Sequence, residues 1–252
     1  MPYQFATENT NYADFASGRV FYAAPGHAAF PVRLSSEIFQ RCLAWRQKQG
    51  GSGPVTIYDP CCGSAYQLST LAYLHWPQIA TILASDAEPE ILQVAARNLS
   101  LLTPEGLEQR AHEIAELQQR YGKASHAEAA VSLEKFKHQL EKTYPAQPIR
   151  TRLFQADATD PEPILTGLAG QKIDLVLADI PYGQLSQWQS STAEKNTENF
   201  LGAMLEALLT VLSKASIVAI MSNKAQKWTP QHYRRLGRLQ VGKRLVLFWQ
   251  PE

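Results

Sequence analysis

The stretch of sequence that decides the fold is Thr56-Ile57-Tyr58-Asp59-Pro60-Cys61-Cys62-Gly63-Ser64-Ala65. It begins as a short apolar run, turns at a proline and a glycine, and leads into a helical pattern. Gly63 has no Cβ, so a ligand can approach the backbone there. The helix that follows offers unpaired N–H groups at its N-terminus. A strand–turn–helix unit of this kind predicts a ligand site at the carboxyl end of a parallel strand.

Further apolar runs alternate with helical stretches along the chain. The expected strands are residues 55–58, 81–84, 151–154, 173–178 and 217–221, and the expected helices are 65–75, 89–101 and 199–212. Continuous apolar runs are typical of strands buried on both faces of a parallel sheet. Residues 238–240 and 244–249, joined around Gly242, indicate an antiparallel hairpin. The pattern predicts an α/β, Rossmann-like doubly wound sheet that is mostly parallel.

The segment before the first strand differs from this alternation. Residues 1–54 are expected to form an N-terminal arm and one helix, which opens near Pro31 with Ser35 or Ser36 as its N-cap. The loop signal at residues 50–54 separates this segment from the main domain, residues 55–252.

A polar stretch, residues 103–148, interrupts the main domain. Its irregular helical spacing predicts a helical insertion, a hairpin that turns near residues 121–123. The insertion is either a substrate arm or a solvated decoration of the fold, and the sequence leaves both interpretations open.

The composition excludes several classes of protein. With 252 residues, 45% of them hydrophobic, and a net charge of +1, the chain is too apolar to be disordered. No apolar run reaches the roughly 18 residues of a membrane helix, and the first residues lack the pattern of a secretory signal. The three cysteines, two of them adjacent, argue against a disulfide framework and for the reducing cytoplasm. The six histidines show no metal-ligand spacing, so no metal is expected.

Charge is unevenly distributed. Residues 207–251 contain no Asp or Glu but eight Lys and Arg residues. A basic region of this kind attracts a polyanion such as nucleic acid. The alternative is a solvated surface on which basic residues cluster by chance.

Acidic residues follow the first three expected strands of the sheet. Asp59 suits a ligand with a cationic ammonium group, as S-adenosylmethionine has. Asp86 lies about 20 residues beyond Gly63, the spacing at which an acid accepts both ribose hydroxyls. Asp157 is placed to accept from an adenine amino group. Each Asp alone is more often a turn residue, but together they favour an adenosine-type cofactor.

The fourth strand ends in the motif Asp179-Ile180-Pro181-Tyr182. An exocyclic amine on a nucleobase is a poor nucleophile because its lone pair is delocalised into the ring. The Asp179 carboxylate and the Ile180 carbonyl supply acceptors that would hold such an amine, and Pro181 fixes the direction of that carbonyl. Tyr182 offers a ring on which a base stacks. Methyl transfer would then depend mainly on orientation.

These motifs resemble those of class I S-adenosylmethionine-dependent methyltransferases that modify base amino groups. Longer stretches are similar to the AviRa family of avilamycin-resistance rRNA methyltransferases. The similar stretches are residues 24–34, 37–41, 58–64 and 181–183 followed by Trp188, with 120–123 and 128–130 in the insertion. The resemblance covers most of the chain.

The resemblance implies methylation of a guanosine base in 23S rRNA near the peptidyl-transferase region, in the cytoplasm. The implied cofactor is S-adenosylmethionine, and the implied partner is 23S rRNA or the large ribosomal subunit. No membrane partner is expected, and the protein is expected to be a monomer. The implied cofactor-binding residues are Arg33, Asp59, Pro60, Cys61, Gly63, Asp86, Ala87, Asp157, Ala158 and Asp179. The implied residues for the target base are Asp179, Ile180, Pro181 and Tyr182.

Two positions depart from the family pattern and three questions stay open. Ala65 stands where the family usually has Gly, and Ile180 where many base-amino methyltransferases have Pro.

The motif favours the exocyclic N2 of guanine, but a ring nitrogen is an open alternative. The same motif would also serve an amino-methyltransferase of DNA or of a small molecule. The last alternative is a catalytically silent RNA-binding protein on the same fold.

Overall fold

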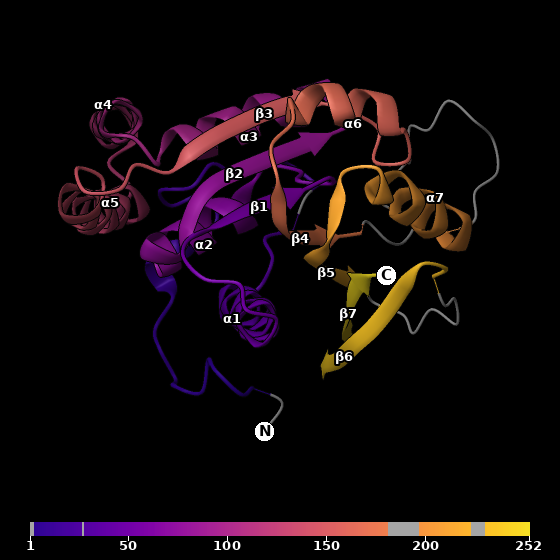
Figure 1. Ribbon diagram of the computed structural model, residues 1–252. Coiled ribbons are helices and arrows are strands. Elements are labelled where there is room, and N and C mark those ends of the chain that lie inside the picture. Colours follow the sequence, from indigo (N-terminus) through magenta and orange to yellow (C-terminus); the bar gives the residue numbers. More distant parts are fainter. Residues whose placement is uncertain (1–2, 27, 181–196, 223–229) are drawn as a thin grey trace.

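The computed structural model describes residues 3–26, 28–180, 197–222 and 230–252. These residues form a seven-stranded sheet in the order β3-β2-β1-β4-β5-β7-β6 (Figure 1). The strands are β1 (Val55–Asp59), β2 (Ile79–Asp86), β3 (Arg150–Gln155), β4 (Ile173–Asp179), β5 (Leu212–Ser222), β6 (Tyr233–Val241) and β7 (Arg244–Pro251). Strands β1 to β5 pair in parallel, and β7 pairs antiparallel with β5 and β6. The predicted mostly parallel sheet with a C-terminal antiparallel hairpin is confirmed.

Helices cover both faces of this sheet. They are α1 (Val32–Lys48), α2 (Tyr66–His75), α3 (Pro89–Ser100), α6 (Pro161–Leu168) and α7 (Thr197–Leu209). Successive residues of a strand point to opposite faces, and Ile57 packs in the cluster with α1, α2 and α3, whereas Tyr58 packs in the cluster with α6 and α7. The sheet is therefore doubly wound, as predicted.

The register of the parallel strands sets the position of the site. Asp59 pairs with Ala84, two residues before the end of β2 at Asp86. Asp179 ends β4 beside Met221 of β5. The carboxyl ends of these strands thus share one edge, and the strand order reverses there between β1 and β4, which is where open α/β sheets bind ligands.

Two local expectations differ from the structure. Helix α1 begins at Val32 with Pro31 as N-cap, so the prediction of Ser35 or Ser36 as the cap is wrong. Both serines are buried inside the helix, where the fixed φ of Pro31 already provides the helix start. Helix α6 was not expected, because two prolines and a glycine in eight residues hide its helical pattern.

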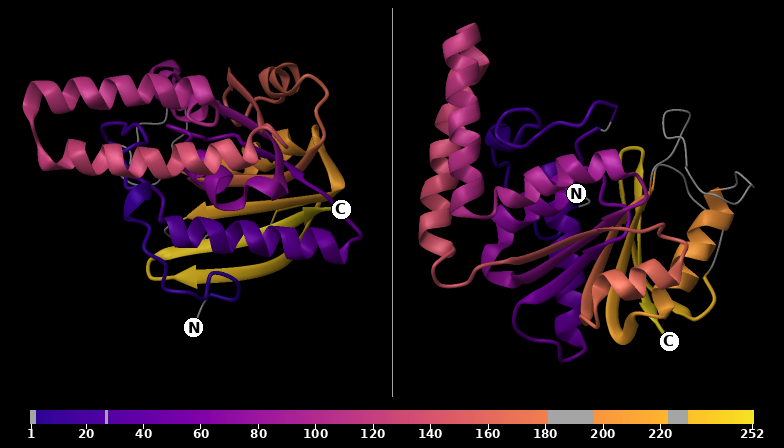
Figure 2. Two further views of the ribbon diagram at one scale, coloured as in Figure 1. Left: turned by 90° about the vertical axis from the view of Figure 1, so that its left-hand side faces the viewer. Right: turned by 90° about the horizontal axis from the view of Figure 1, so that it is seen from above.

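The helical insertion is a hairpin, as predicted, made of α4 (Pro104–Tyr121) and α5 (Ala124–Thr143). Gly122 makes the turn in the left-handed region, with φ 59°. Figure 2 shows the two helices side by side, projecting beyond the rest of the fold. Buried Arg110 anchors α4 to the N-terminal arm by donating to the carbonyls of Val20 and Arg19.

The N-terminal arm is fixed to α1 by a buried carboxylate. Glu37 of α1 accepts hydrogen bonds from the backbone N–H groups of Gln4, Phe5 and Ala6, and from Arg41. Burial opposes ionisation, but these bonds hold the pKa of Glu37 below its usual value. The arm packs in the same core as the sheet. The domain boundary at residue 54 stays a prediction.

None of the described helices is long and apolar enough to cross a membrane.

Candidate active site

The strand ends bring four carboxylates around one point at the edge of the sheet. Burial raises the pKa of the Cys61 thiol well above its usual range, and four nearby acids raise it further. These acids are Asp59, Asp86, Asp157 and Asp179. The sequence-predicted acids therefore lie together, although they come from four separate strand ends.

Asp59, the last residue of β1, lies deepest in this cluster, with 2% of its surface exposed. Its Oδ1 accepts from the Cys61 N–H at 3.0 Å. Burial first, and then the charges of Asp179 and Asp86, hold the pKa of Asp59 well above its usual range. A bound cation would relieve this repulsion, so the cluster favours a positively charged ligand group.

The loop after β1 leaves room for a ligand at Gly63. Its φ is +52°, and a Cβ built there meets no atom within 4 Å. The Gly63 N–H donates to Oδ2 of Asp86 at 2.9 Å, and the Cys62 N–H donates to the Ser85 carbonyl at 2.9 Å. The ends of β1 and β2 are thus fixed to each other, and Asp86 is part of the loop's own structure.

Asp157 and its neighbours form the third corner. Oδ1 of Asp157 accepts from the N–H and the hydroxyl of Thr159, at 2.9 and 2.8 Å. Ala158 is buried, whereas Ala87 is partly exposed, and the Ala87 carbonyl accepts from Gln155 at 3.0 Å. The Asp157 side chain is therefore held in an Asx-type turn at the sheet edge.

Asp179 closes the cluster on the side of β5. The N–H of the next residue, Ile180, donates to the Met221 carbonyl at 3.1 Å, which fixes the end of β4 against β5. The guanidinium of Arg244 lies 3.8 Å from Oδ2 of Asp179 and stacks 4.8 Å from the centre of the Phe30 ring. The remaining motif residues, Pro181 and Tyr182, lie outside the described part of the chain.

Arg33 has other partners than those expected. It lies in the first turn of α1, and its guanidinium donates to the carbonyls of Ala6 and Thr7, at 2.8 and 2.9 Å. It also lies 4.4 Å from the centre of the Tyr3 ring. In the structure Arg33 holds the N-terminal arm, and its role toward a methionine carboxylate stays a prediction.

The residues present fit a cofactor with a cationic amino-acid part. The acids supply negative potential, and Gly63 leaves the loop backbone accessible. Gln67, in the first turn of α2, is buried, and neither of its amide atoms has a hydrogen-bond partner among the described residues. Buried polar groups of this kind are normally satisfied, so a polar ligand or a water is expected beside the loop.

Comparisons with known proteins show the family of the chain. A family model described as rRNA methyltransferase AviRa matches residues 1–244. The chain belongs to the AviRa family of rRNA methyltransferases. It is 38% identical to the 23S rRNA (guanine(2535)-N(1))-methyltransferase of Streptomyces viridochromogenes over 242 residues, or 96% of this chain and 93% of that protein. The predicted family is confirmed.

Two solved structures of the rRNA methyltransferase aviRa from Streptomyces viridochromogenes also match this AviRa-family chain. Their TM-scores are 0.85 and 0.86 at 36% identity, and the matches cover 98% of this chain and 95% and 96% of those chains. The family assignment and the fold therefore rest on the whole chain rather than on one motif.

Sequence reasoning missed two residues that support the site of this AviRa-family protein. Arg244 stands out in the sequence only as part of a basic stretch, although it contacts Asp179. Asn98 of α3 donates to the Ser64 carbonyl at 2.9 Å and exchanges hydrogen bonds with the Tyr22 backbone, so it fixes the glycine loop to the arm. Both contacts join residues far apart in sequence, and no local pattern indicates them.

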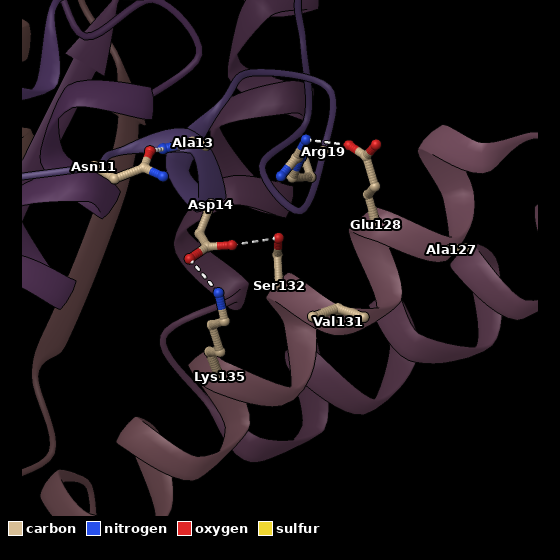
Figure 3. A pocket seen from close by; sticks show the side chains of 9 residues that line it. All are labelled: Asn11, Ala13, Asp14, Arg19, Ala127, Glu128, Val131, Ser132 and Lys135. Atoms are coloured by element: carbon tan, nitrogen blue, oxygen red, sulfur yellow. Dashed lines mark hydrogen bonds and ion pairs between the residues drawn. The ribbon is translucent and has the colours of Figure 1, made fainter.

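A separate hollow of about 430 Å³ lies between the arm and α5 (Figure 3). Asp14 accepts from Ser132 and Lys135, at 2.7 and 2.8 Å, and Arg19 pairs with Glu128. These contacts span the hollow and join the arm to the hairpin of the AviRa-family fold. The polar groups that line the hollow bond to one another, so we interpret the hollow as part of the structural contact between the arm and the hairpin.

Proposed function

We propose that this protein transfers a methyl group from S-adenosylmethionine to N1 of a guanosine in 23S rRNA. The proposed nucleotide corresponds to the one named for the Streptomyces viridochromogenes relative. The observation that carries the proposal is the carboxylate cluster around the glycine loop, in a chain that aligns with that relative over 96% of its length.

The cofactor would lie over the carboxyl ends of β1, β2 and β3. When bound, S-adenosylmethionine supplies an electrophilic methyl group on a sulfonium. We assign Asp59 and the backbone of residues 60–63 to the methionine part, and Asp86 with Ala87 to the ribose. Asp157 and Ala158 are assigned to the adenine, and Arg33 to the carboxylate. The buried position of Asp59 and the open backbone at Gly63 support this arrangement.

Asp179 is assigned to the target base. N1 of guanine carries a hydrogen, and its electron pair becomes available only as that proton leaves. We assign the Asp179 carboxylate, at the end of β4, to accepting this proton, while the cofactor would supply the methyl group that N1 takes up. We assign Ile180, Pro181 and Tyr182 to holding the base, as the motif predicts.

The name of the relative favours N1 over the exocyclic N2. By itself the motif favours an amine, because the two hydrogens of an amine suit two neighbouring acceptors. N1 and N2 lie side by side on the same edge of guanine, so the same acceptors serve either atom. The relative acts on N1, and we therefore propose the ring nitrogen, which the motif alone left open.

The partner we propose is 23S rRNA, free or in the large ribosomal subunit, in the cytoplasm. Arg234, Arg235 and Arg238 are exposed on β6, at one edge of the sheet, and suit a phosphate backbone. Large apolar side chains with substantial exposure are scattered in the described part of the chain: Phe5, Tyr121, Val131 and Leu165. Their scatter favours a monomer, which light scattering tests.

Mass-spectrometric mapping of 23S rRNA nucleosides tests the activity. The protein is incubated with S-adenosylmethionine and unmodified rRNA or large subunits, with Asp179→Asn as the inactive control. We expect 1-methylguanosine at one position with the wild type and none with the variant. Methylation of DNA or of a small molecule but not of rRNA would contradict the proposal. Binding of RNA without any binding of S-adenosylmethionine in calorimetry would indicate a silent RNA-binding protein.

A further inference from the structure

The helical hairpin continues beyond the part that packs on the fold. The buried positions of α4 end at Ile114, and those of α5 begin at Ala129. Residues 118–125 are all exposed. Seven residues of α4 at 1.5 Å each extend the hairpin by about 10 Å past its core. Packing on the core therefore does not explain why the hairpin extends this far. Figure 2 shows the hairpin projecting away from the rest of the fold.

The tip presents an aromatic ring between cationic groups. Tyr121 is 53% exposed, more than any other tyrosine, phenylalanine or tryptophan in the described part of the chain. The guanidinium of Arg120 and the ammonium of Lys123 lie 5.4 and 5.9 Å from the centre of its ring. These distances are at the outer limit of cation–π contact. The cations therefore flank the ring and leave it accessible.

The charge of the tip differs from that of the rest of the hairpin. Residues 117–127 contain no Asp or Glu, whereas the hairpin outside them is rich in glutamate. Within the described residues, neither Arg120 nor Lys123 pairs with a carboxylate. Glu128, the first acid beyond the tip, is paired with Arg19. The positive charge at the tip is thus available to a partner.

We propose that the hairpin tip, residues 120–123, is a second RNA-contacting point, at which Tyr121 stacks on an unpaired base and its flanking cations bind phosphates. This inference rests on the proposed function, since it names a second part of the same rRNA substrate. Cations beside an exposed ring suit single-stranded nucleic acid, because every base has a π-face and a phosphate. Elsewhere on the hairpin, glutamates pair with lysine or arginine, so the tip is the part whose positive charge is free of neighbouring acids.

The hairpin separates the tip from the start of β3. Helix α5 has 20 residues, which makes it about 30 Å long. The C-terminal end of α5 leads into β3 of the sheet, and its N-terminal end is at the hairpin tip. The tip contains none of the acids that cluster at the strand ends, so we assign it to substrate binding rather than to the methyl-transfer step.

Equilibrium binding to a 23S rRNA fragment that carries the target nucleotide tests the inference. Lys123→Ala and Lys142→Ala form a matched pair, because both remove an exposed lysine from the hairpin, one at the tip and one at the base. We expect Lys123→Ala to weaken binding and to reduce the slope of log K against log salt by about 0.7–0.9. Lys142→Ala should match the wild type. Equal slopes for the two variants would overturn the cationic contact.

The ring is tested separately. Tyr121→Ala should raise the Kd at least about fivefold, the lower end of what one aromatic stack on a base contributes, while Tyr121→Phe stays within twofold of the wild type. Unchanged melting temperatures would show that both variants are folded. A wild-type Kd for Tyr121→Ala would overturn the stacking role. Weaker binding to assembled subunits with unchanged binding to naked rRNA would assign the tip to a ribosomal protein and also overturn the proposal.

These outcomes are separate from those of the proposed function. If the wild type binds the fragment but methylates no guanosine, the proposed activity fails, and the binding comparison still decides the role of the tip. If the wild type methylates the fragment and all tip variants bind as it does, the tip proposal alone fails.

Discussion

The guanidinium of Arg244, at the start of β7, lies 3.8 Å from the carboxylate of Asp179 at the end of β4. The antiparallel hairpin thus brings a cation to the acid that we assign to the target base. Both side chains are partly exposed, at 25% and 29%, so solvent weakens the pair without removing it. An opposite charge at this distance favours the ionised carboxylate, which is the form able to accept a proton.

Removal of this cation should therefore change the pH dependence of activity. In Arg244→Gln we expect the acidic limb of the kcat/KM profile to move to higher pH, because ionisation of Asp179 loses a favourable neighbour. Arg244→Lys, which keeps the charge, should restore most of the wild-type profile. An unmoved acidic limb in Arg244→Gln, with rRNA binding intact, would show that the pair does not act on the reaction.

A substitution of Asp179 should separate methyl transfer from cofactor binding. Asp179→Asn keeps a hydrogen-bond acceptor but cannot take the N1 proton, so methyl transfer to 23S rRNA should be abolished. Binding of S-adenosylmethionine should stay within about threefold, because the deeper acid, Asp59, is unchanged. Methyl transfer is measured with a radiolabelled methyl group and binding by calorimetry. Loss of both together would contradict the separate roles.

Asp86 should affect the cofactor instead. Asp86→Ala removes the acceptor of the Gly63 N–H and, in our proposal, of the ribose hydroxyls. We expect S-adenosylmethionine binding to weaken by about 1–3 kcal/mol, the scale of an unmade charged hydrogen bond. Asp160→Ala is the matched control, since it removes an exposed acid that caps α6 outside the cluster. Equal calorimetric Kd values for the two variants would remove Asp86 from the site.

The sequence predicted the part of this site that depends on local patterns. A continuous apolar run followed by Gly63 identifies β1 and its loop, and parallel topology then places the acids after each strand at one edge. The remaining contacts of the site join residues that are distant in the sequence. Arg244 contacts Asp179, 65 residues away, and Asn98 contacts Ser64, 34 residues away. Such contacts leave no periodic signal in the sequence.

Exposed strand segments were also harder to predict. The first residues of β5, around Lys214, are exposed, and so are Arg234 and Arg235 of the edge strand β6. Their polar side chains interrupt the apolar run by which a buried strand is identified. The expected strands at 217–221 and 238–240 therefore covered only the more buried parts of β5 and β6. Ala65, which stands where the family usually has Gly, adopts the left-handed conformation with φ 53°, and this explains why a glycine suits that position.

The raised pKa of Asp59 predicts that cofactor binding depends on pH. Burial and the neighbouring acids hold its pKa well above the usual range, so in the free protein it retains a proton to higher pH than an exposed Asp. A bound ammonium group favours the ionised form, so binding should release this proton and should strengthen as the pH rises toward the raised pKa of the free protein. Calorimetry in buffers of different ionisation enthalpy measures the release. The Asp59→Asn variant should bind the cofactor more weakly and without proton release. Proton uptake by the wild type would contradict the assignment of Asp59.

The two edges of the sheet offer a matched test of the RNA-binding surface. Arg235 on β6 and Arg152 on β3 are arginines on the two edge strands, but only β6 belongs to the acid-free C-terminal region. We expect Arg235→Ala to weaken 23S rRNA binding and to reduce the salt slope by about 0.9 for each phosphate that the variant no longer neutralises. Arg152→Ala should leave both unchanged, because net charge changes equally in the two variants and only the position differs. If Arg152→Ala has the larger effect, the RNA lies along β3, and the basic β6 edge is a solvated surface.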